Sequence, residues 1–565
     1  MRTQKCERRF LSIAIPAAVV AVGVLASAAQ HHTAPKFYPD DPLAREPDTR
    51  DASDVRAWDI NQTADRLINS FSRPGDPRPN VRAQNLNTID EVPDSSWFTN
   101  RIYATVVTAD ALRRGPNATA GPAPGGWSVI RATGVGDAPG LTARDSYGDV
   151  WFLTFDHVSS PQAATGALAV ARRLFWAFGY NQIESHLTRV HADDLDIADT
   201  PTTLPGYEAS GELTRRDVEQ VLARAARDPD GSYRVLAARA APGRAVGGFK
   251  YHGTRPDDPN DIVPHEHRRE LRALKVFGAW TNLVNVEAAG TLDTVIEENG
   301  RGAVRHYLQD VGSTFGTGAH GARDWDEGYE YVYDGGKLLK RLVTLGFYIQ
   351  PWQVVRYEEL PEIGRFEGHA FEPERWRTRV PAAAVLRARD DDTFWAALRV
   401  SAFTDEMIRT AVRAAEYSNP AAERLLGDVL IERRDKIVRA YLPKINPLVH
   451  VALGRDGTLT FENAAVRAGV AAAPAGGYRA EWYRFDNATG RVTPLGPPTT
   501  GQLERLPAPP QVVSDPPNVI RVDMSALGPP HASWIVPLHA YFRRTQAGWT
   551  LVGLERLPDG AGSRQ

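Results

Sequence analysis

The chain has 565 residues, of which 42% are hydrophobic and 24% are charged, and its formal net charge is −3. A chain of this length and composition is expected to form two to four domains with a large core, which excludes a broadly disordered protein. Acidic and basic residues are interspersed, so the sequence lacks the basic footprint of a nucleic-acid-binding protein, and no nucleic-acid partner is expected.

Residues 1–28 have the pattern of an export signal. Four basic residues precede an apolar run at residues 11–25, and three small residues, 26–28, follow it. We expect an exported protein, periplasmic or extracellular. The alternative is an uncleaved membrane anchor, the only case in which a membrane contact is expected. Cys6 lies within the signal, so the processed chain would have no disulfide and no cysteine metal ligand.

The next two regions are predicted from composition and periodicity. Residues 29–125 are expected to be an extended leader and packing segment. From Trp127 onward, three segments have strand-like alternation between glycine turns, and residues 161–178 carry apolar side chains at helical spacing. Three strands followed by a helix predict a β-rich lobe at residues 126–260, which would be the N-lobe of a kinase-like fold.

Two features of this lobe are candidate ligand sites. Gly134, Gly136 and Gly140 are candidates for a loop that covers phosphates, with ordinary hairpin turns as the alternative. The turn at residues 255–261 contains three aspartates. These could hold calcium through oxygen ligands, and the alternative is that they cap the helix that follows.

Residues 261–445 are predicted to form a helical C-lobe with a central loop. The first helix is expected at residues 265–280. His265 and His267 are two residues apart on it and point to different faces, which argues against a metal pair. Its arginines are expected to be free for surface or salt-bridge contacts: Arg268, Arg269 and Arg272.

The sequence pattern changes twice after Gly316. An irregular aromatic stretch reaches about residue 380 and is followed by three predicted helices, at residues 392–401, 404–417 and 419–442. From residue 446 to residue 565, alternating segments predict a small all-β, sandwich-like domain.

The centre of the chain follows the order of a kinase-like catalytic centre. In that order, a loop carries a catalytic Asp and, five residues later, a metal-binding Asn; a strand then delivers a second metal-binding Asp next to a Gly. Here Asn285 takes the place of the catalytic Asp, and Gly290 takes the place of the Asn. Asp310, followed by Val311 and Gly312, keeps the expected chemistry and is the candidate metal ligand.

Four segments between residues 50 and 445 resemble a group of secreted bacterial proteins with a kinase-like, HipA-like core: EVPDSSWFTNRI, WFLTFD…ATGALAVARRLFWAFGYN, GTRPDDPNDIVPHEHRRELR and RHYLQDVGSTFG. The resemblance implies an α+β fold, with a two-lobed kinase-like core and a small all-β domain after it. It also places Thr154 where a phosphate-pairing Lys belongs. Leu168 then stands where a Glu would hold that Lys.

These substitutions predict a catalytically degenerate site. Thr154 carries no charge to offset phosphates, and Leu168 forms no ion pair. Asn285 cannot take a proton from an attacking hydroxyl, and Gly290 offers no side-chain oxygen to a metal. We expect an exported pseudokinase that acts as a binding or scaffold module in the cell envelope. Its partner would be an envelope protein or a small ligand, and it would need no cofactor.

An active atypical phosphotransferase is the main alternative. It would use ATP with magnesium or manganese, with Asp310 on the metal and Asp293 or Glu287 as the base. Lys250 could then supply the missing positive charge. A hydrolase is a third alternative with little support, because the sequence lacks both the G-x-S-x-G and the H-E-x-x-H motifs.

Overall fold

A six-stranded sheet forms the first layered unit of the computed structural model, which describes residues 34–134, 138–198, 213–333, 343 and 351–557. Its strand order is β4-β6-β3-β2-β1-β5, and every pairing is antiparallel except that of β1 with β5. The strands are β1 (Trp127–Ala132), β2 (Gly140–Arg144), β3 (Val150–Phe155), β4 (Ser185–Val190), β5 (Leu195–Ile197) and β6 (Tyr233–Arg239). The three predicted strands are therefore confirmed.

The two faces of this sheet pack against different helices. Alternate strand residues such as Leu153 and Val235 pack with the apolar side of α4 (Arg215–Leu222). On the opposite face, Leu236 joins the main core together with α3 (Ala163–Phe178), which is almost entirely buried. Gly179 ends α3 as the sequence predicted. Its φ of 126° favours glycine, and an added Cβ would lie 2.4 Å from the Phe98 ring.

The single helix predicted at residues 265–280 is wrong. The chain instead forms a short 3-10 turn, η2 (His265–His267), and two helices, α5 (Arg269–Arg272) and α6 (Leu274–Thr281). Arg268 separates the turn from α5 with extended backbone angles (φ −87°, ψ 123°). The three arginines, expected to make surface or salt-bridge contacts, do form ion pairs but are buried, with Arg269 and Arg272 at 0% exposure. A turn and two short helices, in place of one straight helix, accompany the burial of these charged side chains.

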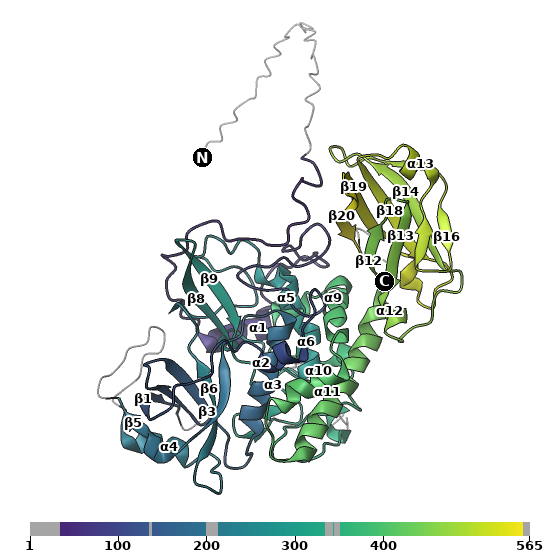
Figure 1. The fold of residues 1–565 in the computed structure, drawn as a ribbon. Coiled ribbons are helices and arrows are strands. Elements are labelled where there is room, and N and C mark those ends of the chain that lie inside the picture. The colour runs from purple at the N-terminus through teal and green to yellow at the C-terminus, as the bar shows by residue number, and fades with distance from the viewer. Residues whose placement is uncertain (1–33, 135–137, 199–212, 334–342, 344–350, 558–565) are drawn as a thin grey trace, which may run out of the picture.

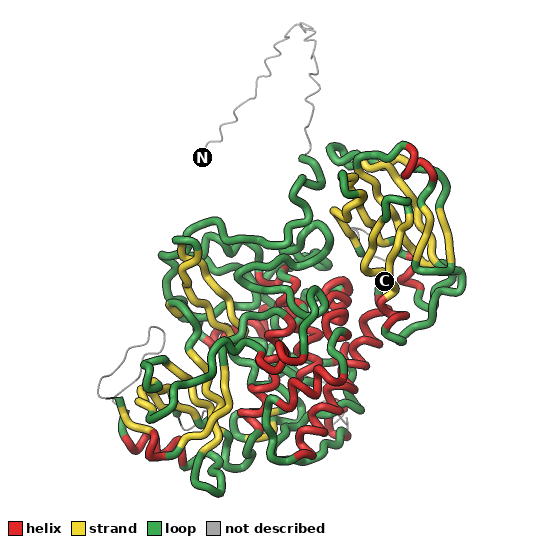
Figure 2. The backbone as a smooth tube through the Cα atoms, viewed as in Figure 1, coloured by secondary structure: helices red, strands yellow, loops and turns green. Residues whose placement is uncertain are grey.

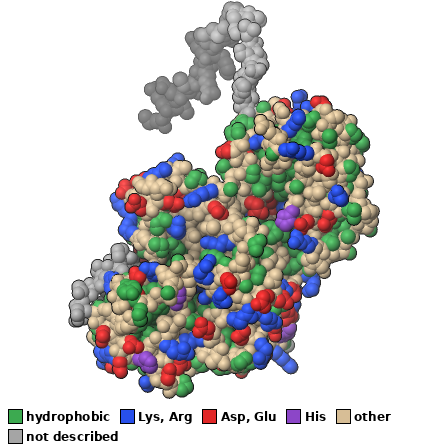
Figure 3. Space-filling view, viewed as in Figure 1, with side chains coloured by type: hydrophobic (Ala, Val, Ile, Leu, Met, Phe, Trp, Pro, Cys, Tyr) green, Lys and Arg blue, Asp and Glu red, His purple; other side chains and the backbone are tan. Residues whose placement is uncertain are grey.

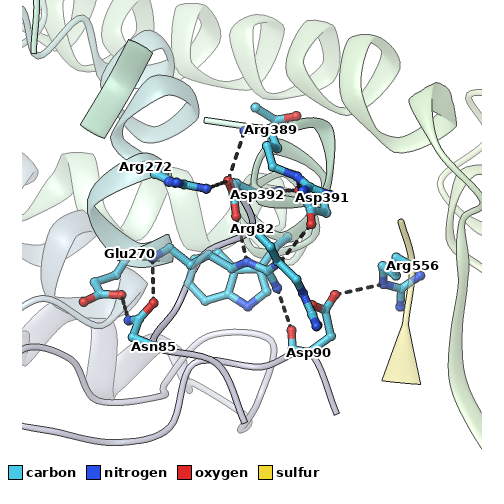
Figure 4. A network of polar contacts seen from close by, with 12 residues as sticks. Arg82, Asn85, Asp90, Glu270, Arg272, Arg389, Asp391, Asp392 and Arg556 are labelled. Atoms are coloured by element: carbon cyan, nitrogen blue, oxygen red, sulfur yellow. Dashed lines mark hydrogen bonds and ion pairs between the residues drawn. The ribbon is translucent and has the colours of Figure 1, made fainter. Parts of the chain in front are cut away.

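The buried arginines belong to an ionic network that joins distant parts of the sequence (Figure 4). Asp392 accepts from Arg269 Nε at 2.9 Å and from Arg272 Nη1 at 3.0 Å. Arg269 also reaches Asp90 Oδ1 at 3.1 Å, and Arg556 approaches the other oxygen of Asp90 at 3.8 Å. Buried charges require such partners, because an unpaired ion in the interior is strongly unfavourable.

A β-hairpin follows α6 and the short turn η3 (Ala288–Gly290). Its strands β8 (Thr291–Glu298) and β9 (Arg301–Leu308) are antiparallel, and β7 (Arg244–Ala245) pairs with β8. The hairpin lies beside the six-stranded sheet (Figure 1). A second small hairpin, β10 (Thr317–Gly318) with β11 (Gly321–Ala322), comes after it.

Helices follow the β10–β11 hairpin in the described chain. They are α8 (Ala383–Leu386), α9 (Asp390–Ser401), α10 (Asp405–Arg413) and α11 (Pro420–Tyr441), with the turns η4 (Pro351–Val354), η5 (Pro373–Arg375) and η6 (Leu442–Lys444). The Asn419 side chain accepts from Ala421 N, and Pro420 opens α11, which confirms the predicted helix start. Trp280 of α6 donates to the carbonyl of Leu430 at 2.8 Å, so α6 and α11 pack directly together.

Residues after α11 are mainly β-structure, drawn in yellow-green in Figure 1. Sheet β12 (Leu448–Leu453), β13 (Thr458–Asn463) and β17 (Arg505–Pro507) has three strands. A six-stranded sheet contains β14 (Tyr478–Phe485), β15 (Val492–Pro494), β16 (Thr499–Gly501), β18 (Val519–Ala526), β19 (Leu538–Thr545) and β20 (Gly548–Glu555). Three short helical segments interrupt them: α12 (Ala464–Arg467), α13 (Pro510–Ser514) and η7 (Ala532–Ile535).

The segment before the first sheet connects these parts through long loops, visible in Figure 2. Its described residues, 34–126, contain only α1 (Gln62–Ser72), α2 (Ala109–Arg114) and isolated bridges. Phe37 packs into the C-terminal β-structure beside Phe485 and Tyr541, while Trp58 bridges to Gly247 near the β8–β9 hairpin.

The visible surface carries both signs of charge without a large region of one sign (Figure 3). In the part of the chain that the structure describes, no helix is both long enough and apolar enough to span a bilayer.

Candidate functional site

Asp310 lies directly after β9, against the loop that precedes the hairpin. The backbone N–H groups of Gln309 and Asp310 both donate to the Gly290 carbonyl at 3.0 Å. The Asn285 backbone N–H lies 3.4 Å from Ser313 Oγ. The structure therefore brings together Asn285, Gly290 and Asp310, which the sequence placed in one site.

The Asp310 side chain is exposed and turns back on its own loop. Its Oδ1 accepts from the Gly312 N–H at 2.9 Å. Asn285 Oδ1 is 3.5 Å from Arg323 Nη1, a long contact. An added Cβ on Gly290 would meet Asp310 O at 3.5 Å, which is ordinary van der Waals contact. The glycine thus leaves the space beside Asp310 without a side-chain oxygen.

Helix α3 packs against the turn that carries Asp310. A Cβ added to Gly312 would be 3.2 Å from Leu168 Cδ2, so the leucine packs on the turn that carries Asp310. Thr154, on the neighbouring strand β3, is half-buried and pairs in register with Leu236 of β6. Thr154 thus lies on the predicted strand and Leu168 on the predicted helix, and neither side chain carries a charge.

Arg172, one helical turn after Leu168, is the site residue that the sequence analysis missed. Its side chain is only 6% exposed, and Nε and Nη1 have no hydrogen-bond partner in the described structure. Burial lowers the pKa of Arg172 to about 10, and the Asp310 carboxylate opposes that shift. Arg172 therefore brings a buried positive charge to the helix that packs on the Asp310 turn. The available signal was a charged residue within the apolar repeat of α3.

Helix α3 is fixed at its start by Asp156. This buried carboxylate accepts from Thr165 N at 2.9 Å and from Thr165 Oγ1 at 2.7 Å. Arg234 of β6 bonds the same hydroxyl at 2.9 Å and reaches the Glu416 carbonyl at 2.8 Å. Burial raises the pKa of Asp156, and its hydrogen bonds and Arg234 only partly offset this. The network ties α3 to the sheet and to the helical body, so Leu168 and Arg172 are held in place.

The candidate replacement bases have other partners. Asp293 is completely buried and bonds Arg255 Nη1 at 3.0 Å and His306 Nδ1 at 2.8 Å. Glu287 pairs with Arg66 at 2.7 Å. The described residues contain no group of three or more His, Cys, Asp or Glu side chains arranged to hold a metal ion. Asp310 is thus a single carboxylate rather than part of such a group.

The other charge candidate, Lys250, also faces elsewhere. Its Nζ lies 3.8 Å from Asp65 Oδ1 on α1 and 5.4 Å from the centre of the Trp58 ring. These contacts give Lys250 a role in holding α1. They provide no substitute for the charge missing at Thr154.

Of the three candidate glycines, the structure describes Gly134 and Gly140. Gly134 is exposed at the end of β1, and Gly136 lies outside the described residues. Gly140 belongs to strand β2 and stands opposite Thr154. Its N–H donates to Thr133 Oγ1 at 3.0 Å. Gly140 is therefore the first residue of the β2 ladder.

Cationic side chains and backbone amides surround the aspartates of residues 255–261. Asp257 accepts from Arg255 Nε at 3.1 Å, and Asp261 accepts from His265 Nε2 at 2.7 Å. Although burial opposes it, His265 and Arg268 hold the pKa of Asp261 well below its usual value. Neither η2 nor α5 has a side-chain cap. Asp257 and Asp261 pair with cations, so the capping interpretation is wrong, and the described residues show no group of three or more side chains arranged to hold a metal ion here.

The two histidines have separate partners, as their spacing predicted. His265 Nε2 contacts Asp261, while His267 Nε2 contacts Asp76 Oδ2 at 3.0 Å and its Nδ1 meets Arg272 at 2.7 Å.

Comparison with known proteins gives one weak likeness. No protein-family model matches the chain, and no curated protein matches it. Two solved structures are weakly similar: the Golgi casein kinase, with a TM-score of 0.28, and the same kinase with Mn/ADP bound, with a TM-score of 0.26. Both are 9% identical to this chain; they cover 72% and 71% of it, and 97% and 96% of their own lengths are matched. A likeness of this size does not bear on activity.

Proposed function

We propose that this chain is a kinase-like protein that has lost phosphotransfer and acts by binding. The observation that carries the proposal is the surroundings of Asp310: Gly290 leaves the space beside it without a side-chain oxygen, and Leu168 packs on the turn that carries it. Phosphotransfer needs metal ligands and an ion pair at these positions, and the chain places a glycine and a leucine there. The order of elements around Asp310 supports the kinase-like assignment: a three-stranded start, α3, α6, a loop and a hairpin.

The side chains at the site support the proposed loss of phosphotransfer activity. Phosphoryl transfer depends on positioning and on neutralising charge on the phosphates and the metal. Thr154 and Leu168 offer a hydroxyl and a hydrocarbon at positions that need an ion pair. Gly290 offers nothing to a second metal. The donor set therefore does not fit a nucleotide bound with magnesium or manganese.

The alternative of an active phosphotransferase has less support. It requires Asp293 or Glu287 to act as a base near Asp310. Asp293 neutralises the fully buried Arg255, and Glu287 is engaged by Arg66. A base has to reach the proton that it removes, within hydrogen-bond distance or through one water. Both carboxylates are instead committed to partners in other parts of the structure.

The binding role is proposed for the cell envelope, on the basis of the export signal at residues 1–28. The partner would be an envelope protein or a small ligand. The interspersed surface charge gives no support for a nucleic-acid partner (Figure 3).

A thermal-shift experiment with ATP tests the proposal. We expect the melting temperature of the full-length protein to be unchanged by ATP with Mg²⁺ or Mn²⁺, relative to the metal alone. A ligand at a hundredfold excess over its Kd would stabilise the folded state by about 2.7 kcal/mol, which such a measurement resolves. A metal-dependent rise that Asp310→Ala abolishes would overturn the proposal and favour the active phosphotransferase.

A further inference from the structure

A cavity of about 770 Å³ lies where the first six-stranded sheet meets the β8–β9 hairpin, two units that stand side by side in Figure 1. We call it the Arg305 pocket. Its walls include residues 148–150, 181–184 and 239–242, with Arg101, Trp176, Arg305 and Tyr307 beside them. None of these residues belongs to the Asp310 site. The volume is typical of a pocket that binds a small molecule.

One side of the Arg305 pocket is apolar. Ile183 and Tyr307 line it, and both belong to a buried cluster, with Ala238 and Leu292, that joins the sheet to the hairpin. Further apolar side chains from β3 and from the turn after β6 line the same pocket: Val150, Ala240, Ala241 and Pro242. The hydrocarbon part of a ligand would pack against this side.

Arg305 brings a positive charge to the pocket without an acidic partner. It is half-buried on β9, and among the residues that the structure describes no carboxylate forms an ion pair with it. Its charge opposes the rise in the pKa of Tyr307 that burial causes, so the guanidinium lies close to that phenol. A neutral phenol leaves the charge of Arg305 uncompensated.

Arg101 brings a second positive charge of the same kind. Its Nη1 donates to the Trp176 carbonyl at 2.8 Å, and its guanidinium lies 4.9 Å from the centre of the Trp176 ring. These contacts orient the side chain without neutralising it. Burial lowers the pKa of Arg101 to about 10, and Asp94 offsets this only in part. Arg101 is therefore still charged at neutral pH, and a guanidinium that has lost water gains from a bound anion.

The two carboxylates in the wall of the pocket are engaged by a third arginine. Arg239 Nη2 lies 2.7 Å from Asp149 Oδ2, and its Nη1 lies 3.8 Å from Glu184 Oε2. Glu184 Oε1 also accepts from Thr119 N at 2.9 Å. Three arginines against two carboxylates leave the wall with one net positive charge, which resides on the side formed by Arg101 and Arg305.

We propose that the Arg305 pocket binds a small organic monocarboxylate, with the carboxylate held by Arg305 and Arg101 and the apolar body against Ile183 and Tyr307. A guanidinium and a carboxylate pair through two parallel hydrogen bonds, and one carboxylate balances the net charge of the wall. A phosphate monoester carries a charge of about −1.5 to −2 at neutral pH and would exceed it. The site is separate from Asp310, so it does not depend on the proposed loss of phosphotransfer.

Isothermal titration of the full-length protein with sodium benzoate tests the proposal. We expect binding to wild type, at least tenfold weaker binding to Arg305→Gln and to Arg101→Gln, and unchanged binding to Arg301→Gln. Arg301 is the matched control, because it lies on the same strand, is exposed and donates to the Thr49 carbonyl, away from the pocket. Arg305 is half-buried without an ion pair, so Arg305→Gln is expected to fold, and circular dichroism checks each variant.

Four further titrants, at matched ionic strength, separate the parts of the recognition. Benzyl alcohol tests the need for charge, benzylammonium tests its sign, acetate tests the need for an apolar body, and phenyl phosphate tests the preference for a single negative charge. We expect each to bind wild type at least tenfold more weakly than benzoate. Absence of benzoate binding to wild type, equal binding of benzoate to all the variants, or binding of any of the four as tight as that of benzoate would each overturn the proposal.

Discussion

Replacing Asp392 with alanine is expected to lower the free energy of unfolding by about 3–5 kcal/mol. Asp392 is completely buried and accepts from two guanidinium groups that are also completely buried, those of Arg269 and Arg272. Its Oδ2 also accepts from the Arg389 backbone N–H at the start of α9, at 3.0 Å. Removing the carboxylate leaves the buried guanidinium groups of Arg269 and Arg272 with one partner fewer. The cost of these poorly compensated charges accounts for most of the expected loss of stability. Urea unfolding followed by tryptophan fluorescence measures the loss.

Asp390 provides a matched control on the same helix. It lies two residues earlier in the first turn of α9, is 43% exposed in its side chain, and pairs with Lys444 at 3.1 Å. An ion pair of this kind contributes about 1 kcal/mol or less. If Asp392→Ala were no more destabilising than Asp390→Ala, the network in Figure 4 would not hold these segments together.

Replacing Asp293 with alanine is expected to destabilise the protein by a similar amount, about 3–5 kcal/mol. Asp293 is the partner of Arg255, whose side chain is 0% exposed, and it also orients His306. Arg255 in turn donates to the carbonyls of Arg56 at 2.6 Å and Val246 at 2.8 Å. Loss of the carboxylate would leave a buried cation between the leader and the hairpin. Thermal and urea unfolding measure the change.

This prediction separates a structural role for Asp293 from the catalytic role considered for it. Glu287→Gln is the matched control, because it removes the pair with Arg66, whose side chain is 52% exposed; we expect about 1 kcal/mol or less. An Asp293→Ala variant as stable as wild type would show that the carboxylate does not hold Arg255 in place. The alternative in which Asp293 is a poised base would then regain support.

Local sequence patterns were sufficient for elements whose partners are close along the chain. The apolar repeat of residues 161–178 predicted α3, and Gly179 marked its end, because a helix face and a left-handed stop are local properties. Asn419 and Pro420 identified the start of α11 for the same reason. Strands β1 to β3 followed from alternation between glycine turns.

The segment 265–281 could not be predicted in the same way. Its arginines have the spacing of a solvated helix face, and local patterns favour that interpretation. Their partners, Asp90, Asp391 and Asp392, come from segments more than one hundred residues away in the sequence. Tertiary ion pairing overrides the local pattern, so the predicted single helix becomes a turn and two short helices.

The candidate site was predicted in part. The order of the central loop, the hairpin and Asp310 placed Asn285, Gly290 and Asp310 together, because their spacing is fixed by one short supersecondary unit. Arg172 was not found. An arginine on a helix can extend toward solvent or remain buried, and only the packing of α3 against the Asp310 turn decides between them.

A manganese titration followed by electron paramagnetic resonance tests the central claim most directly. The full-length protein is titrated with Mn²⁺ in the presence of ADP, with Asp310→Ala as the reference. The account predicts the same free Mn²⁺ signal for both proteins, because Gly290 adds no side-chain oxygen beside Asp310 and the described residues hold no group of three or more metal-binding side chains there. One equivalent of bound Mn²⁺ in wild type, absent from Asp310→Ala, would contradict the account and identify Asp310 as a working metal ligand.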